Sequence, residues 1–272
     1  MYALDFEYDG KYLSSFGFII CDFNFSDGVN DTTAGSTITF NKVPRNHGKI
    51  YSLSSTQYDE CITTTFDICK DPDIYDLEDM EISEIEYRDI MRWLNQREFC
   101  KFSVITDIDS EHELCYFQAS FNIEKLKISE KLYGLRLTME TDKPFGYGHE
   151  QIINLKFTSG NTSKTYTDNS DEIGSVYPVV VIKCNQSGNL TIRNELLNCT
   201  TIIQNCKSGE VITLHGDTQI ITTSLQSHDI CNDFNYDFFR IGNTKDSRSN
   251  LITSSLACDM TIKHSPIIKD SP

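Results

Sequence analysis

The stretch "ISEIEYRDIMRWLNQREFCKFSVI", residues 82–105, contains the clearest helical pattern in the chain and the strand that follows it. Ser83 and Glu86 have the spacing of a capping box, in which each side chain accepts a hydrogen bond from the other residue's backbone N–H. The apolar residues that follow have the spacing of one buried helical stripe, namely Tyr87, Ile90, Met91 and Leu94. With Asn95 as a C-terminal cap, the pattern predicts a helix over residues 83–95.

Trp93 is the only tryptophan among the 272 residues, and it lies at the edge of this stripe, three positions after Ile90. A large aromatic side chain in this place is expected to pack against the sheet that the following strands form. We therefore predict that Trp93 anchors the helix in a hydrophobic core.

Alternation of apolar and polar residues dominates the rest of the chain, and this period of two is typical of strands with one buried face. In "CITTTFDICK" (61–70), Ile62, Phe66 and Ile68 alternate with polar residues, and "LYGLRLTME" (132–140) has the same pattern. Turn-forming segments separate such stretches. The sequence therefore predicts a mainly β fold, built from antiparallel strands with one main helix.

A segment that contains proline and glycine, "TDKPFGYGHEQ" (141–151), interrupts the alternation. Because the length exceeds that of a typical single domain, we place a domain boundary there and expect domains at 1–148 and 149–272. Beyond it, the apolar run "VYPVVVIKC" (176–184) reads as a core strand. Further strands are predicted at residues 189–194, 210–216, 219–224, 234–242 and 258–264, which favours a β-sandwich for the second domain.

The chain has 40 acidic and 24 basic residues, and its formal net charge is −16. Contacts with nucleic-acid phosphates or anionic membranes need clustered Lys and Arg, and no basic run of that kind is present. We therefore expect no sequence-specific nucleic-acid binding. We also expect no membrane insertion, because no apolar run approaches 18 residues. The N-terminus has no secretory signal pattern, so the ten cysteines are expected to be reduced thiols.

The candidates for chemistry each have a structural explanation. The acidic stretch "DPDIYDLEDMEISEIE" (71–86) lacks calcium-loop spacing and is expected to be an exposed surface beside a helix N-terminus. The acidic group at 107–113 fits a hairpin turn. His112 and Cys115 carry no protease-like spacing, although a Cys-dependent hydrolase remains the enzymatic alternative. We accordingly predict no catalytic, cofactor-binding or metal-binding residues, no cofactor, and a protein that is not an enzyme.

Aromatic residues are dense in "DFNYDFFRIG" (233–242). Sugar-binding β-sandwiches stack aromatic rings on sugars, so a carbohydrate-binding module is an alternative. The period of two favours the simpler interpretation, in which Phe234, Tyr236 and Phe238 are alternating core residues of one strand.

Three stretches in order resemble the distal tail proteins of long-tailed bacteriophages. They are "YDGKYLSSFGFII" (8–20), "EISEIEYRDIMRWLNQREFCKFSVI" (81–105) and "CYFQASFNIEKLKISEKLYGLRLTMETDKPFGYG" (115–148). Within them, the matched elements are the aromatic–Gly strand from Phe6 to Gly10, Arg92-Trp93-Leu94 at the helix end, the Tyr116–Ala119 element, and Pro144-Phe145. The second half adds "IGSVYPVVVIK" (173–183), "GNLTIRN" (188–194), "SGEVITLHGDTQII" (208–221) and "FFRIGNTKD" (238–246).

This resemblance implies a structural virion protein at the tail tip or baseplate, assembled in the cytoplasm of the host bacterium. It implies a hexameric ring between the tail tube with its tape-measure protein and the receptor-binding proteins. The N-terminal domain would be the ring-forming belt, of barrel or sandwich type, and the C-terminal domain a galectin-like β-sandwich. A tail-tube subunit is a further alternative, although such subunits usually have one domain. We expect exposed strand edges to join the subunits, and acidity to line a lumen or rim that does not bind DNA.

Overall fold

The structure is a computed structural model that describes residues 5–21, 23, 37–45, 48–57, 60–105, 115–158 and 162–269. The chain divides into two compact units. Unit 1 comprises Met1–Tyr147 with Lys269–Pro272, and unit 2 comprises Gly148–Ile268. The fold is β-rich with several antiparallel sheets, as the sequence predicts.

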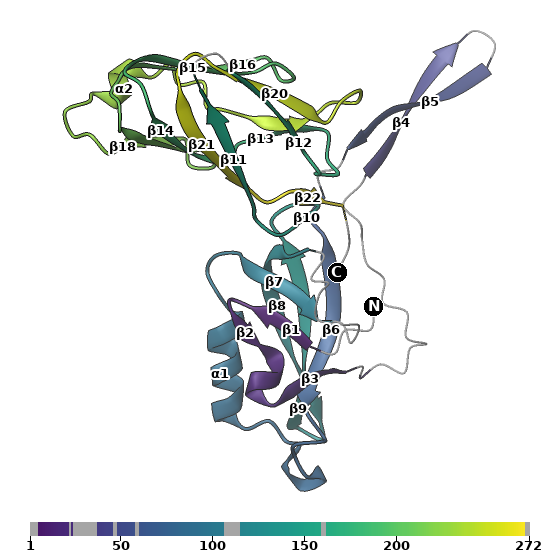
Figure 1. The fold of residues 1–272 in the computed structure, drawn as a ribbon. Helices are drawn as coiled ribbons and strands as arrows, with labels where there is room; N and C mark the ends of the chain where they lie inside the picture. Colours follow the sequence, from purple (N-terminus) through teal and green to yellow (C-terminus); the bar gives the residue numbers. More distant parts are fainter. Residues whose placement is uncertain are drawn as a thin grey trace. The chain divides into compact units, whose positions relative to one another are not determined.

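Unit 1 is built on one antiparallel sheet of seven strands (Figure 1). The strands are β1 (Asp5–Tyr8), β2 (Lys11–Tyr12), β3 (Phe18–Cys21), β6 (Thr63–Lys70), β7 (Cys100–Ile105), β8 (Phe117–Ile128) and β9 (Lys131–Thr141). Their order in the sheet is β2-β1-β7-β8-β9-β6-β3, so the first strand pairs with one that begins far along the chain. The short strand β10 (Gly146–Tyr147) and two 3₁₀ helices, Leu13–Phe16 and Leu77–Asp79, complete the regular elements of this unit apart from a helix and a hairpin.

The predicted helix is confirmed as α1 (Glu84–Leu94). Ser83 is its N-cap, and both hydrogen bonds of the capping box are present, from Glu86 N–H to Ser83 Oγ (3.3 Å) and from Ser83 N–H to Glu86 Oε2 (2.7 Å). At the other end, the N–H of Asn95 donates to the carbonyl of Met91 (3.0 Å). The capping box therefore fixes where the helix begins.

Trp93 joins α1 to the sheet, as predicted, and is 3% exposed. Its indole ring stacks on Phe6 (centroids 5.6 Å apart) and on Phe16 (4.5 Å), and its Nε1–H donates to the carbonyl of Tyr8 (2.7 Å). The apolar body is thus buried while its one polar atom keeps a partner. Ile90 and Leu94 of the same helix face are also buried.

A separate two-stranded antiparallel sheet is formed by β4 (Thr37–Arg45) and β5 (Gly48–Gln57). The register runs from Thr37 opposite Gln57 to Arg45 opposite Gly48, with an irregularity at Thr39/Phe40. Among the described strands, neither pairs with a third.

Unit 2 is a β-sandwich (Figure 1). Its five-stranded sheet has the order β11 (Gln151–Phe157), β21 (Cys258–His264), β14 (Val179–Cys184), β17 (Val211–His215), β18 (Ile220–Thr223). Its four-stranded sheet has the order β12 (Ser163–Thr167), β20 (Ser249–Ser254), β15 (Gly188–Asn194), β16 (Cys199–Cys206). The remaining elements are the pair β13 (Gly174–Val176) and β19 (Ile241–Asn243), the short helix α2 (Ile230–Asp233) and β22 (Ile267–Ile268).

The predicted strand over residues 234–242 is wrong except at its end, where β19 begins at Ile241. Instead, side chains of this segment bond to the backbone of strand β16. Asn235 Oδ1 accepts from Ile202 N–H (3.0 Å), Asn235 Nδ2 donates to the carbonyl of Thr200 (2.8 Å), and Asp237 Oδ2 accepts from Thr200 N–H (3.1 Å). These side-chain bonds take the place of most of a backbone ladder, of which only the bridge between Phe234 and Ile203 forms.

The prediction that Tyr236 is a buried strand residue is wrong. Its φ of 58° lies in the left-handed region, which no continuous strand contains, and its side chain is 65% exposed. Phe234 and Phe238 are buried, as predicted, at 4% exposed each.

Candidate interaction surfaces

The two outer strands of the seven-stranded sheet, β2 and β3, each have one neighbour among the described strands. The outer strand of a sheet is a place where a strand of another chain can add. In β3, Phe18 is buried, while the three residues after it are only partly exposed. This outer strand therefore presents apolar side chains at the edge of the sheet.

The β4–β5 ladder offers two such edges. Isolated two-stranded hairpins are marginally stable in water, and usually gain stability from a third strand or a covering element. No other described strand pairs with this ladder. Residues 32–58 also lack Asp and Glu while containing Lys42, Arg45 and Lys49, in a chain with a net charge of −16.

The acidic stretch predicted to be surface folds around a buried lysine. Lys70, at the end of β6, has a side chain only 6% exposed. Its Nζ lies 2.8 Å from Glu86 Oε1, donates to the carbonyl of Asp79 (2.9 Å), and sits 4.7 Å from the centroid of the Tyr75 ring. The loop between β6 and α1 is thus tied to one cationic centre.

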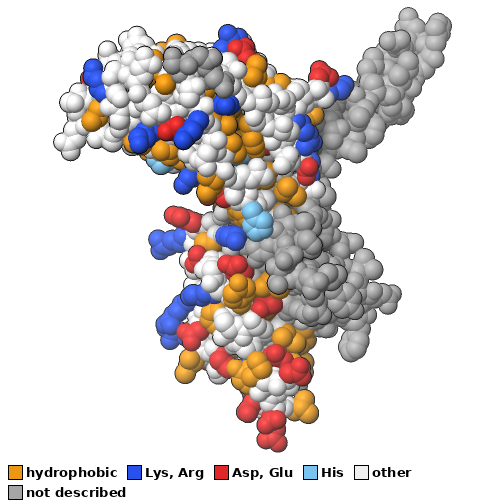
Figure 2. Space-filling model, viewed as in Figure 1, with side chains coloured by type: hydrophobic (Ala, Val, Ile, Leu, Met, Phe, Trp, Pro, Cys, Tyr) orange, Lys and Arg blue, Asp and Glu red, His pale blue; other side chains and the backbone are white. Residues whose placement is uncertain are grey.

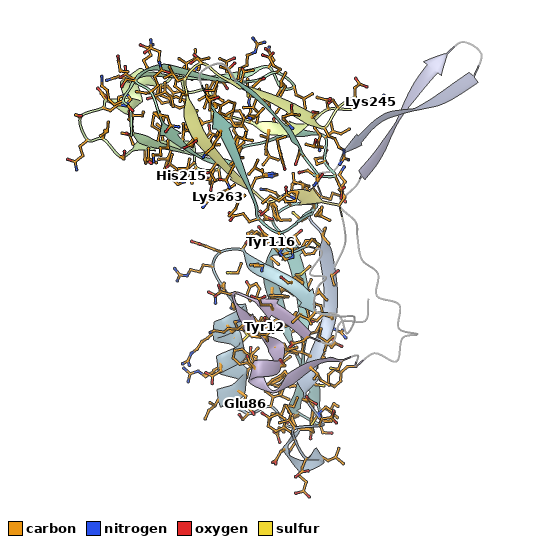
Figure 3. The ribbon with its side chains drawn as sticks, viewed as in Figure 1. Tyr12, Glu86, Tyr116, His215, Lys245 and Lys263 are labelled. Carbon is orange, nitrogen blue, oxygen red and sulfur yellow. The ribbon has the colours of Figure 1, made fainter. Side chains whose placement is uncertain are left out.

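Glu86, labelled in Figure 3, connects this centre to the helix cap. Burial opposes ionisation, but hydrogen bonds from Lys70 and Ser83 outweigh it and lower the pKa of Glu86 below its ordinary value. The sequence analysis did not identify Lys70, although a single lysine directly before a long acidic run could have indicated an ion pair.

The outer face of the same loop carries exposed apolar side chains beside the carboxylates. Ile74 is 62% exposed, Leu77 90% and Ile85 74%. Figure 2 shows acidic and hydrophobic side chains together at the end of unit 1 that carries this loop. Exposed apolar side chains rimmed by polar residues mark interaction sites on many proteins.

No group of three or more His, Cys, Asp and Glu residues that could hold a metal ion occurs within the described ranges. The acidic group at Asp107, Asp109, Glu111 and Glu113 lies outside the described residues, as does His112. Cys115 is described and partly buried. The suggested pairing of Cys115 with His112 therefore stays untested.

Unit 2 contains a buried ionic network. The carboxylate of Glu210 is 0% exposed and accepts hydrogen bonds from His228 Nδ1 (2.6 Å), Thr223 Oγ1 (2.5 Å) and Lys207 N–H (2.8 Å). The other imidazole nitrogen of His228 lies 3.1 Å from Asp233 Oδ2. A neutral imidazole has only one N–H, so two carboxylate neighbours favour the protonated ring.

The pKa shifts follow from this geometry. Burial lowers the pKa of His228, but the hydrogen bond and charge of Glu210 outweigh it, so the pKa is raised above 6.5. For Glu210, burial is again opposed, here by hydrogen bonds from Thr223 and His228, and its pKa is lowered below 4.5. The network ties α2 and the end of β16 to the sandwich.

Of the aromatic residues considered for sugar stacking, Phe234 and Phe238 are buried and are not available. Tyr236 is exposed, and its hydroxyl donates to the carbonyl of Cys231 (2.9 Å). In the part of the chain that the structure describes, no helix has the length and apolar character needed to cross a membrane.

Comparisons with known proteins agree with the two-unit architecture. Residues 1–143 match the family model described as "Phage tail protein N-terminal domain", and residues 145–264 match the one described as "Phage tail C-terminal domain". No curated protein sequence matches.

Among solved structures, the fold is similar to that of the Dit protein (gp 19.1) of phage SPP1. The TM-score is 0.65 at 10% sequence identity, and the match covers 96% of this chain and 98% of the SPP1 chain. That protein is described as a paradigm of the hub adsorption apparatus in phages that infect Gram-positive bacteria. Because the first family model alone covers more than half of the sequence, the chain belongs to this family of phage tail proteins.

Proposed function

We propose that the chain is a distal tail protein, a structural and non-enzymatic component of the tail tip or baseplate hub. The observation that carries the proposal is the likeness to SPP1 Dit over nearly the whole of both chains. A likeness that includes both units favours this role over a tail-tube subunit, because such subunits usually have one domain.

In this proposal, six copies form a ring between the tail tube with its tape-measure protein and the receptor-binding apparatus. The ring assembles in the host cytoplasm and remains at the tail tip of the virion. Unit 1 is the ring-forming belt, and unit 2 is a galectin-like module that holds the tail-associated or receptor-binding proteins.

The contacts between subunits are heterologous, so that rotation repeats one pair of unlike surfaces until the ring closes. The β4–β5 ladder and the outer strands β2 and β3 are the surfaces best suited to this, because each of these strands has only one neighbour among the described strands. The net charge of −16 supports an acidic lumen or rim that does not hold the DNA passing through it. A basic lumen in the assembled ring would contradict that part.

Native mass spectrometry and negative-stain images of the purified protein test the proposal. We expect particles of six chains with sixfold symmetry and a central opening. A monomer at every concentration would contradict the ring.

A variant locates the ring contact. Replacing residues 38–56 with a short Gly/Ser linker removes the ladder, and should abolish the ring without unfolding unit 1, whose seven-stranded sheet excludes β4 and β5. Ile220→Thr, on an exposed outer strand of unit 2, is the matched control and should leave the ring intact. If the shortened chain still forms rings, the contact lies on β2 or β3.

A further inference from the structure

Unit 2 buries one carboxyl group for which no described residue supplies a counter-charge. Asp168 follows β12 directly and is 1% exposed. Its Oδ1 accepts from the N–H (3.3 Å) and the hydroxyl (3.0 Å) of Ser170. Its Oδ2 has no hydrogen-bond partner among the described residues, and none of their salt bridges includes it. A buried carboxylate in this state is costly unless something neutralises it.

A second buried oxygen belongs to Asn243, which is 3% exposed. Its Nδ2 donates to the carbonyl of Ser170 (2.7 Å) and, less closely, to that of Glu172 (3.4 Å). These two bonds fix the orientation of the amide, because a flipped side chain would place oxygen against oxygen. Asn243 Oδ1 is then an acceptor, and within the described ranges it has no donor.

Both side chains bond to Ser170, so they meet at one loop, residues 168–174. Hydrogen bonds close this loop onto two other segments. Asp168 N–H donates to the carbonyl of Arg248 (3.0 Å), Gly174 pairs with Asn243, and Ile267 N–H donates to Ser170 Oγ (3.1 Å). Lys245, in the turn between Asn243 and Arg248, is exposed and points away from the sandwich (Figure 3), so it does not neutralise Asp168.

A third buried polar side chain, His264, lies near this loop. The Tyr166 hydroxyl donates to Gln151 (2.9 Å) and lies 2.8 Å from His264 Nε2. No described residue donates to Nδ1.

We propose that this cluster binds a hard divalent cation, with Asp168 Oδ2 and Asn243 Oδ1 as protein ligands. Carboxylate and amide oxygens suit Ca²⁺ or Mg²⁺, which take further ligands from backbone carbonyls and water. A buried water alone would satisfy the two oxygens but would leave the charge of Asp168 uncompensated.

Elemental analysis and thermal unfolding of the full-length protein test the site. We expect about one Ca²⁺ or Mg²⁺ per chain after gel filtration without chelator. After treatment with EDTA, the unfolding midpoint of unit 2 should fall, and it should recover on addition of CaCl₂ or MgCl₂.

Two variants assign the ligands. Asp168→Asn and Asn243→Ala should each lose the bound metal and the metal-dependent shift in midpoint. Asp217→Asn, in an exposed turn of the same unit, is the matched control and should keep both.

Results of two kinds would overturn the proposal. One is wild-type protein that carries no metal and has the same unfolding midpoint in EDTA, Ca²⁺ or Mg²⁺. This result does not depend on whether a variant folds. The other is an Asp168→Asn chain that is more stable than wild type in Ca²⁺ or Mg²⁺, because that gain would mean the buried charge had no cation beside it. Neither result concerns ring formation, so the cation site and the proposed function are tested independently.

Discussion

The two units solve the same problem, covering the apolar face of a sheet, in different ways. Unit 1 has one large sheet and covers it with a helix, and seven of its 17 buried core residues in the described ranges are aromatic. Unit 2 lays two sheets against each other, and only four of its 21 are aromatic. Large rings let a single helix fill the space that a second sheet fills in the sandwich.

This difference determines where each unit is fragile. The core of unit 1 depends on a few large side chains that meet at Trp93, whereas unit 2 spreads its core over many aliphatic residues. Conversely, unit 2 buries the Glu210–His228 pair, so its stability depends on protonation. We expect size-reducing substitutions to damage unit 1 most, and a rise of pH through the folded pKa of His228 to act on unit 2.

The largest effect is expected for Trp93→Ala. Loss of a buried tryptophan should lower the free energy of unfolding of unit 1 by about 3–5 kcal/mol, because a cavity replaces the ring. Urea unfolding followed by circular dichroism would measure it. Arg92→Ala, whose side chain is 68% exposed on the same helix, is the control and should change stability by less than about 0.5 kcal/mol. Wild-type stability in Trp93→Ala would rule out the anchoring role.

The next effect concerns pH. The raised pKa of His228 contributes stability that is fully present below pH 6.5, its unfolded value, and is lost as pH rises through the folded pKa. The lowered pKa of Glu210 contributes stability present above pH 4.5 and lost as pH falls through its folded pKa. Unit 2 should therefore be most stable between these two values, as thermal unfolding across a pH series would show.

His228→Gln should remove the loss of stability above pH 6.5 and should cost roughly 2 kcal/mol at lower pH, the scale of a hydrogen bond to a charged group. The control is His149→Gln, because His149 is exposed in the same unit. An unchanged pH profile in His228→Gln would show that other groups cause the dependence.

The smallest effect is expected at the helix cap. Ser83→Ala removes the hydrogen bond to Glu86 N–H and should destabilise unit 1 by about 1 kcal/mol. Glu84→Gln, in the first turn but outside the capping box, should cost less, as equilibrium unfolding of both variants would reveal. Equal losses would assign the effect to helix electrostatics rather than to the box.

The sequence predicted what local patterns encode. The helix at 83–95, the burial of Trp93 and most strands of unit 2 depend on residues a few positions apart, which periodicity and capping describe well. The sheet order and the two-stranded ladder depend on pairing between distant segments, which one sequence does not display.

Two charged residues of β6 are buried because each has a partner far along the chain. The alternation in residues 61–70 places Asp67 on the polar face of its strand, yet it is 4% exposed and accepts two hydrogen bonds from Arg136 of β9 (2.8 and 2.9 Å). Lys70 is buried against Glu86 in the same way. The partners, 16 and 69 positions away in the sequence, offset the cost of burying these charges. No sequence pattern over a few residues links positions so far apart. The expected absence of catalytic residues stays a prediction, and the cation site proposed at Asp168 and Asn243 departs from the expected absence of metal-binding residues.

The strand order also governs when each unit can form during synthesis. In unit 1, β1 must wait for β7, and in unit 2 all seven residues of β11 pair with β21, near the end of the chain. Contacts between such distant segments slow folding, and chains emerge from the ribosome N-terminus first. A chain that stops before Cys258 would lack the strand between β11 and β14, and would expose two apolar edges to aggregation, although every strand of the seven-stranded sheet had been made.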